Sequence, residues 1–267
     1  MVSATASGPT HGARRGRALR WVPVWQRNLL VWRKLAVPSV LSNFGEPVLY
    51  LLALGFGLGA FVGRIEGMPY IVFIASGILC SSALISASFE AMYSGYSRMA
   101  TQRTWDAMTT APLDWRDVVL GEVVWAATKA LISSTAILIV ASALGAVYSW
   151  TAIFALPIVF LSALCFASMA MVMTAIAKAY DNFLYYQTLC ITPMFMLGGV
   201  FFPIEQMPGP IQKLAAIMPL THTVAIVRPL VTGLPVNNLG GHVLVLAAYG
   251  VSAWWLATRL LERRLSA

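Results

Sequence analysis

The chain has 267 residues, of which 59% are hydrophobic and only 10% are charged, and its mean hydropathy is +0.76. Soluble domains carry about 25% charged residues, so this composition excludes an ordinary globular domain and indicates a polytopic membrane protein with one membrane domain. The formal net charge of +8 is spread in a way that predicts membrane topology, and we expect no nucleic-acid partner.

Three segments are predicted along the chain. Residues 1–18, rich in Ser, Gly, Ala and Arg, are expected to be a disordered cytoplasmic tail, with no cleavable signal peptide. Residues 19–36 are expected to form an amphipathic interfacial helix, and 37–267 the membrane domain.

The predicted interfacial helix contains WVPVWQRNLLVWRKL. Trp25 and Trp32 are seven residues apart and share one helix face, whereas Arg27 and Lys34 share nearly the opposite face. We expect the indoles in the headgroup layer and the cations toward anionic lipid. The alternative is that this segment begins a long first span.

Six apolar stretches approach the roughly 20 residues that cross a bilayer. An even number places both termini on the same side. Lys and Arg cluster before the first span, between the second and third, after the fourth and at the end, so both termini are predicted to be cytoplasmic in a bacterial inner membrane. The stretches are at about 38–62, 69–95, 118–145, 150–176, 182–202 and 238–259.

Charged residues inside the predicted spans are costly and usually face protein or water. Glu46, followed by Pro47, is either a substrate-contacting carboxylate or part of a structural ion pair. Lys129 needs a partner, for which Glu46, Glu90 and Glu122 are candidates. We predict at least one such pair.

The stretch after the second span is too patterned for a simple linker. Residues from about Thr101 to Thr110 are predicted to form a short helix that ends before Pro112, and Asp114 to cap the next helix. A short cytoplasmic helix between two spans offers a docking point for a soluble partner; the alternative is a solvated loop.

The segment LGGVFFPIEQMPGPIQKLAAIMPLTHTVAIVR breaks at several prolines, so it is predicted to be a broken external helical segment between spans five and six. It is either a cap that seals the protein or a gate through which a substrate leaves. Gly198 and Gly199 allow a bend or close approach, Phe201 and Phe202 are expected to wedge between subunits, and Glu205 to pair with Arg228. The candidate gate residues are Gly198, Gly199, Phe201, Phe202, Pro203, Glu205 and Arg228.

No metal site is expected. Cys80, Cys165 and Cys190 are scattered through the spans and are interpreted as small packing residues. His222 is interpreted as a lone histidine, because no metal-ligand spacing surrounds it.

Three motifs in order resemble one family. The run RMATQRTWDAMTTAPLDWRDVVLGEVVWAATKA, the first span FGEPVLYLLALGFGLG, and GGVFFPIEQMP followed by MPLTH are similar to ABC type-2 exporter permeases, in particular the nodulation protein J-like branch of lipo-oligosaccharide exporters. The similarity covers about 40–262.

The resemblance implies two permease copies, each bound to a cytoplasmic ABC ATPase subunit that carries ATP and Mg²⁺. The chain has no phosphate-binding loop motif of its own, so it is expected to be a non-enzymatic subunit that moves an amphiphilic substrate outward. The short helix is then the coupling helix. Its expected partner contacts are Arg103, Thr104, Trp105 and Asp106, with Trp105 as the apolar anchor; the alternative for Trp105 is a headgroup-layer aromatic.

Two other classes stay open. A secondary transporter is expected to show internal repeats and ion-coordinating residues near the midplane; no repeat is visible in the sequence, and such residues are few. A membrane scaffold without transport is the second alternative.

Overall fold

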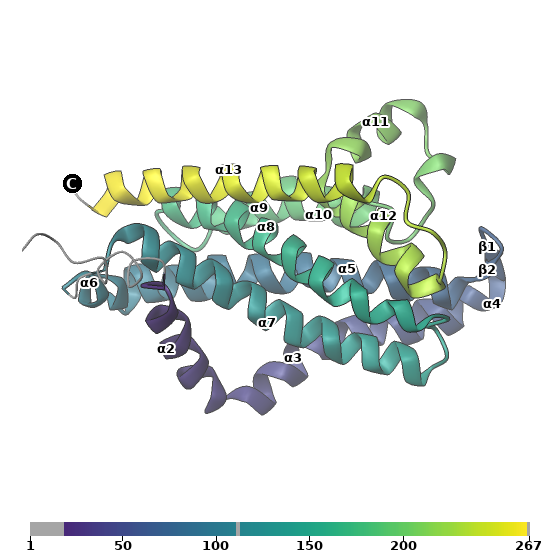
Figure 1. The fold of residues 1–267 in the computed structure, drawn as a ribbon, viewed down its shortest axis with the longest axis horizontal. Helices are drawn as coiled ribbons and strands as arrows, with labels where there is room; N and C mark the ends of the chain where they lie inside the picture. The colour runs from purple at the N-terminus through teal and green to yellow at the C-terminus, as the bar shows by residue number, and fades with distance from the viewer. Residues whose placement is uncertain (1–18, 111–112, 266–267) are drawn as a thin grey trace, which may run out of the picture.

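The structure of this chain, a computed structural model, describes residues 19–110 and 113–265; the predicted tail at 1–18 lies outside them. Long helices packed lengthwise make up nearly all of the described chain (Figure 1). Five helices are long and apolar enough to cross a membrane, or six if one bent pair counts as a span, which confirms the all-α polytopic class. The five cover Gly45–Val62, Tyr70–Thr101, Trp115–Ala143, Trp150–Ile176 and Leu239–Arg264.

The first two described helices meet at a bend, which we call the α2–α3 elbow. Helix α2 (Val22–Arg33) crosses the direction of the bundle, and α3 (Ala36–Leu52) turns into it (Figure 1). A Cβ atom at Gly121 would lie 2.6 Å from Cβ of Val24, so a glycine is what allows α2 to pack this closely on α7 (Trp115–Ala143). This contact fixes the position of α2 on the bundle.

The two indoles of α2 are partly exposed, and each has a hydrogen-bond partner within the protein. Trp25 donates its indole N–H to the Thr128 hydroxyl at 3.0 Å, and Trp32 donates to Ser39 at 2.9 Å. The two hydroxyls offer these N–H groups fixed partners.

The first span continues from α3 through a π-helical segment, η1 (Ala53–Leu58), into α4 (Gly59–Val62). A two-residue hairpin follows, with β1 (Arg64–Ile65) antiparallel to β2 (Met68–Pro69). Its turn residues Glu66 and Gly67 both have positive φ, as a tight hairpin turn requires. The sequence interpretation placed no strand here.

Helix α5 (Tyr70–Phe89) is the centre of the bundle, because 89% of its apolar span window is buried. The helix continues past the predicted end at about residue 95, through π-helical segments η2 (Glu90–Ser94) and η3 (Ser97–Thr101). Such segments add a residue to a turn and are frequent at functional sites.

The short helix predicted near Thr101–Thr110 is present as α6 (Thr104–Thr109). Arg103, just before it, has a left-handed backbone with φ 48°, a conformation that non-glycine residues rarely adopt. As predicted, Asp114 caps α7, and it does so in a capping box with Asp117.

The fifth predicted span is shorter than expected. Its helix runs through α9 (Asn182–Tyr186), η5 (Gln187–Ile191) and α10 (Thr192–Leu197) and ends at Leu197, five residues before the predicted end. The bend comes at Gly199, whose φ of 79° is open to glycine, so the break precedes Pro203.

The external segment after this break consists of three short helices. They are η6 (Ile204–Gln206), α11 (Gly209–Ile217) and α12 (Pro219–Thr232). Helices α11 and α12 meet at 88° across Met218, which confirms the predicted broken segment.

The remaining helices are η4 (Trp150–Phe154), α8 (Ala155–Ile176) and α13 (Leu239–Leu265), with α13 packed along α8. Arg264 donates to the carbonyls of Thr174 and Ala175 at 3.2 and 3.0 Å, which satisfies the end of α8. Helices α2 and α6 and the end of α13 lie at one end of the bundle, and α11 and the β hairpin lie at the other (Figure 1).

Candidate functional site

A cluster of buried charges lies where α6 meets the bundle. The Arg98 guanidinium bridges two carboxylates, 3.0 Å from Glu90 and within hydrogen-bonding distance of both oxygens of Glu122. Lys129 contacts Glu90 at 2.9 Å. Glu90 is 5% exposed and Glu122 is 1% exposed, so these charges depend on one another for compensation.

The predicted partner for Lys129 is therefore found, and it is Glu90 among the three candidates. Glu122 belongs instead to Arg98, one of the basic residues between the second and third predicted spans. The cue for Arg98 was available, because two glutamates near the ends of spans require positive partners.

Two indoles complete the cluster. Trp105 donates its N–H to Glu122 at 3.1 Å, and Trp125 donates to Glu90 at 2.8 Å. Each carboxylate thus accepts hydrogen bonds from both a cationic side chain and an indole N–H. These charge-assisted hydrogen bonds compensate for the burial of the carboxylate.

The position of Trp105 corrects its expected role. Its side chain is 0% exposed, so the indole cannot present an apolar surface to another polypeptide or to headgroups. Trp105 instead fastens α6 to the bundle through Glu122. In contrast, Arg103 and Asp106 are exposed on either side of it, and Thr104 accepts a long hydrogen bond of 3.5 Å from Arg27.

Glu46 is not part of this cluster and forms no ion pair within the described chain. It is exposed to a cavity of about 220 Å³ between α3, α5 and α10. The Ser82 and Ser86 hydroxyls of α5 line the same cavity and have no hydrogen-bond partner among the described residues. The cavity also has an aromatic side, formed by Tyr50, Phe89 and Phe195.

Arg228 holds the external break in place. Its guanidinium donates to the Gly199 carbonyl and, at 3.1 Å, to the Ser76 hydroxyl, and it lies 3.7 Å from the centre of the Phe73 ring. In the described chain it forms no ion pair with Glu205, so the expected pairing is wrong. The Gly199 carbonyl at the bend accepts a hydrogen bond from Arg228 instead.

The two external phenylalanines differ. Phe201 is 9% exposed and packs edge-on against Phe195 at 4.8 Å between ring centres, so it does not form the expected wedge. Phe202 is 54% exposed and stays a candidate for contact with a second subunit. Gly198 packs against Leu220, and a Cβ atom there would lie 3.0 Å from that side chain.

His222 is not a lone histidine. Its Nδ1 lies 2.7 Å from Nδ1 of His242 on α13, and its Nε2 lies 3.0 Å from the Ala216 carbonyl. Tyr249 donates to the carbonyl of Ile217 at 3.0 Å. These contacts fasten helix α11 to α13, and the bond between the two Nδ1 atoms needs one ring to donate and the other to accept.

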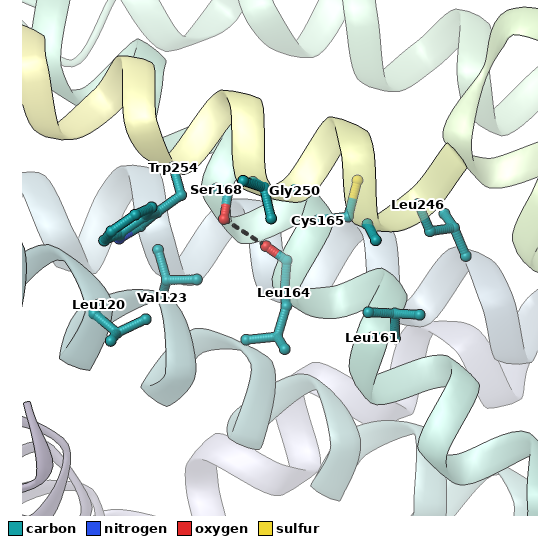
Figure 2. A pocket seen from close by; sticks show the side chains of 11 residues that line it. Leu120, Val123, Leu161, Leu164, Cys165, Ser168, Leu246, Gly250 and Trp254 are labelled. Atoms are coloured by element: carbon teal, nitrogen blue, oxygen red, sulfur yellow. Dashed lines mark hydrogen bonds between the residues drawn. The ribbon is translucent and has the colours of Figure 1, made fainter. Parts of the chain in front are cut away.

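A second hollow, of about 390 Å³, lies between α7, α8 and α13 (Figure 2). None of the described residues that line it is charged, and the Ser168 hydroxyl donates to the Leu164 carbonyl at 2.7 Å. Gly250 brings α13 close to Cys165 there. The three cysteines are free thiols, in agreement with packing roles.

Comparison with known proteins gives a consistent result. Residues 21–231 match the family described as ABC-2 type transporter. The chain is 46% identical to nodulation protein J of Rhizobium leguminosarum bv. viciae over 247 residues, covering 92% of this chain and 95% of that protein. It is 44% identical to nodulation protein J of Rhizobium meliloti (strain 1021) over 245 residues, covering 92% and 94%. It is 26% identical to the inner membrane transport permease YadH of Escherichia coli (strain K12), covering 90% and 93%.

Proposed function

The chain belongs to the ABC-2 type transporter family, and from that premise we propose that it is the membrane permease of an exporter driven by a separate cytoplasmic ABC ATPase. Two copies of the chain pair with two ATPase subunits, which bind ATP and Mg²⁺. The permease itself catalyses no reaction.

The observation that carries this proposal is the attachment of α6 to buried charges of two spans. Trp105 donates to Glu122 in α7, and Glu122 shares Arg98 with Glu90 in the continuation of α5. A force applied by an ATPase to the exposed Arg103 and Asp106 would pass through Trp105 into both spans. The left-handed backbone at Arg103 gives α6 a sharply defined start, which suits a mechanical contact.

The first span supports pairing with a second copy. Only 11% of the residues in its span window are buried, and Tyr50 and Phe56 are exposed large side chains on it. We assign this face, together with Phe202 at the external break, to the contact between the two permeases, with membrane lipid covering the rest.

The proposed substrate is amphiphilic, such as a lipo-oligosaccharide or another glycolipid. The resemblance to nodulation protein J-like exporters supports this class. So does the cavity at Glu46, where a carboxylate lies beside aromatic rings and two serine hydroxyls that have no partner among the described residues, since hydroxyl groups and apolar chains would both find partners there. The broken segment with Pro203 and Arg228 is the proposed external gate.

The proposed orientation is in a bacterial inner membrane with both termini in the cytoplasm. Basic residues at the α6 end support it, as does the position of α2 and the end of α13 at that same end (Figure 1). The ATPase then docks where Arg103 and Asp106 are exposed.

The test is reconstitution with and without a candidate ATPase subunit in proteoliposomes. We expect ATP hydrolysis to depend on the permease and export of a lipo-oligosaccharide to depend on ATP. An Arg103→Glu, Asp106→Arg double variant should lose ATPase recovery, whereas the matched Arg33→Glu, Lys34→Glu variant should keep it. Transport that persists without ATP would indicate a secondary transporter, and ATPase recovery unchanged by the double variant would remove α6 from the interface.

A further inference from the structure

We propose that the cavity between α2 and the charge cluster is a binding site for the phosphate headgroup of an inner-leaflet phospholipid, with Arg27 and Asn28 as its recognising residues. The cavity has a volume of about 230 Å³. It lies at the α2–α3 elbow, and the proposal does not depend on which substrate the protein exports. The lining residues that carry the argument are Arg27, Asn28, Val31, Leu35, Arg98 and Lys129.

The cavity contains one positive charge more than its surroundings neutralise. Glu90 is occupied by Arg98 and Lys129, and Glu122 is occupied by Arg98 and Trp105. The third cation, Arg27, has only neutral partners among the described residues, the Asn28 amide oxygen at 3.0 Å and the Thr104 hydroxyl at 3.5 Å. Three cations therefore face two carboxylates that are already satisfied.

The pKa of Arg27 reflects this excess of positive charge. Burial lowers the pKa of Arg27, and the nearby positive charge of Arg98 lowers it further, against a smaller opposing effect of Glu122. An anion bound beside Arg27 would relieve both penalties, because an opposite charge favours the ionised guanidinium.

A second polar group in the wall lacks a partner. Asn28 is 3% exposed, and its amide nitrogen has no acceptor in the part of the chain that is described. Its orientation is fixed, since the amide oxygen accepts from Arg27 and the reverse orientation would place two donors against each other. A buried amide without an acceptor is costly, and a phosphate oxygen is the complementary group.

The rim of the cavity identifies the anion as part of a lipid. Val31 and Leu35 line the cavity and are 52% and 63% exposed, and Leu30 and Val37 nearby are 59% and 75% exposed. An apolar rim beside a cationic pocket fits acyl chains leaving a phosphate headgroup at the membrane surface. A soluble anion would gain nothing from this rim.

The site is held ready by the packing of α2. Gly121 lets Val24 approach α7, and Trp32 packs edge-on against Trp125 at 6.0 Å between ring centres. A rigid wall reduces the entropy lost on binding.

The experiment compares the purified full-length chain in nanodiscs of phosphatidylcholine alone and of an equal mixture of phosphatidylcholine and phosphatidylglycerol. Native mass spectrometry counts retained phosphatidylglycerol, and thermal unfolding gives the shift in Tm between the two lipids. The variants are Arg27→Gln, Asn28→Asp and, as a matched control, Arg33→Gln, an exposed cation of the same helix outside the cavity.

We expect the wild type and Arg33→Gln to retain phosphatidylglycerol and to show the upward shift in Tm, and Arg27→Gln to lose both. Asn28→Asp keeps the shape of the side chain and supplies its own negative charge, so it should lose lipid retention while keeping its Tm in phosphatidylcholine. This second variant carries the test if Arg27→Gln fails to fold.

Three results would overturn the proposal. One is equal loss in Arg33→Gln, which would indicate general surface attraction. Another is retention of phosphatidylglycerol by Asn28→Asp. The third is an equal rise in Tm when inorganic phosphate is added to the detergent-solubilised chain, which would make the occupant a free anion.

Discussion

The indole N–H of Trp105 lies 3.1 Å from a carboxylate oxygen of Glu122, and this contact ties a six-residue helix outside the spans to a buried charge inside one. Short helices have little stability of their own, so α6 (Thr104–Thr109) owes its fixed position to this bond and to the burial of the ring. The same carboxylate holds Arg98. A displacement of α6 therefore changes the electrostatic balance of the cluster, in addition to its packing.

The first prediction distinguishes the effect of the Trp105 N–H hydrogen bond from the effect of packing its ring. Trp105→Phe keeps most of the buried ring but removes one of the two donors to that oxygen of Glu122, which still accepts from Arg98, at a cost of about 1.5–3 kcal/mol for a hydrogen bond to a charged group. We expect a modest fall in the free energy of unfolding, with export reduced more strongly than ATP hydrolysis.

The measurement is the ratio of export to ATP hydrolysis in proteoliposomes, with Trp150→Phe as control because Trp150 is 77% exposed and remote from α6. If Trp105→Phe lowers stability but leaves that ratio at the wild-type value, the bond to Glu122 has a purely structural role.

The second prediction concerns the order of importance within the charge cluster. Arg98→Met leaves Glu122 with only Trp105 and removes one cation from Glu90, so we expect a loss of about 3–5 kcal/mol. Lys129→Met should cost less, since Glu90 keeps Arg98, Trp125 and Ser94 as partners.

Thermal unfolding in detergent checks this order, and an Arg98→Met, Glu122→Gln double variant gives the coupling between the two residues. The double variant should be more stable than Arg98→Met alone, because the orphaned carboxylate is neutralised. A Lys129→Met variant that unfolds more readily than Arg98→Met would contradict the assigned order.

The third prediction tests the cavity at Glu46. Glu46 is exposed and forms no ion pair within the described residues, so Glu46→Gln should leave the Tm nearly unchanged. Export should fall if the carboxylate contacts the substrate, while ATP hydrolysis without substrate stays intact. Glu66→Gln, an exposed acid in the β1–β2 turn, is the matched control. Equal export by both variants and the wild type would remove Glu46 from the transport path.

The local features of this fold were predictable from the sequence because they depend on near neighbours. Asp114 caps α7 as its position after Pro112 indicated, and Lys129 has a carboxylate partner because an unpaired charge in a span is too costly. The choice of Glu90 over Glu122 was beyond the sequence, since it depends on where Arg98 points once α5 extends through its π-helical segments.

Features set by packing between distant elements were missed. The sequence of α6 has no clear periodicity, so the inward orientation of Trp105 could not be read from it. His222 and His242 come together from two helices that meet only after the external break, and the sequence contains no signal for that contact. The early end of α10 follows from the backbone at Gly199 and not from the more conspicuous Pro203.

The last prediction concerns the external break, where Arg228 donates to the Gly199 carbonyl and to Ser76. Arg228→Met keeps an apolar stem beside Phe73 but leaves the carbonyl at the bend without this donor, at a cost of about 1–3 kcal/mol. We expect faster amide hydrogen exchange in residues 198–207 than in the wild type, because the bend loses a fixed contact with α5. Lys213→Met, an exposed cation on α11, should exchange as the wild type does. Unchanged exchange in Arg228→Met would mean that the backbone of the broken segment is held by Gly77, which lies so close to Val200 that a Cβ atom there would be 2.5 Å from its carbonyl oxygen.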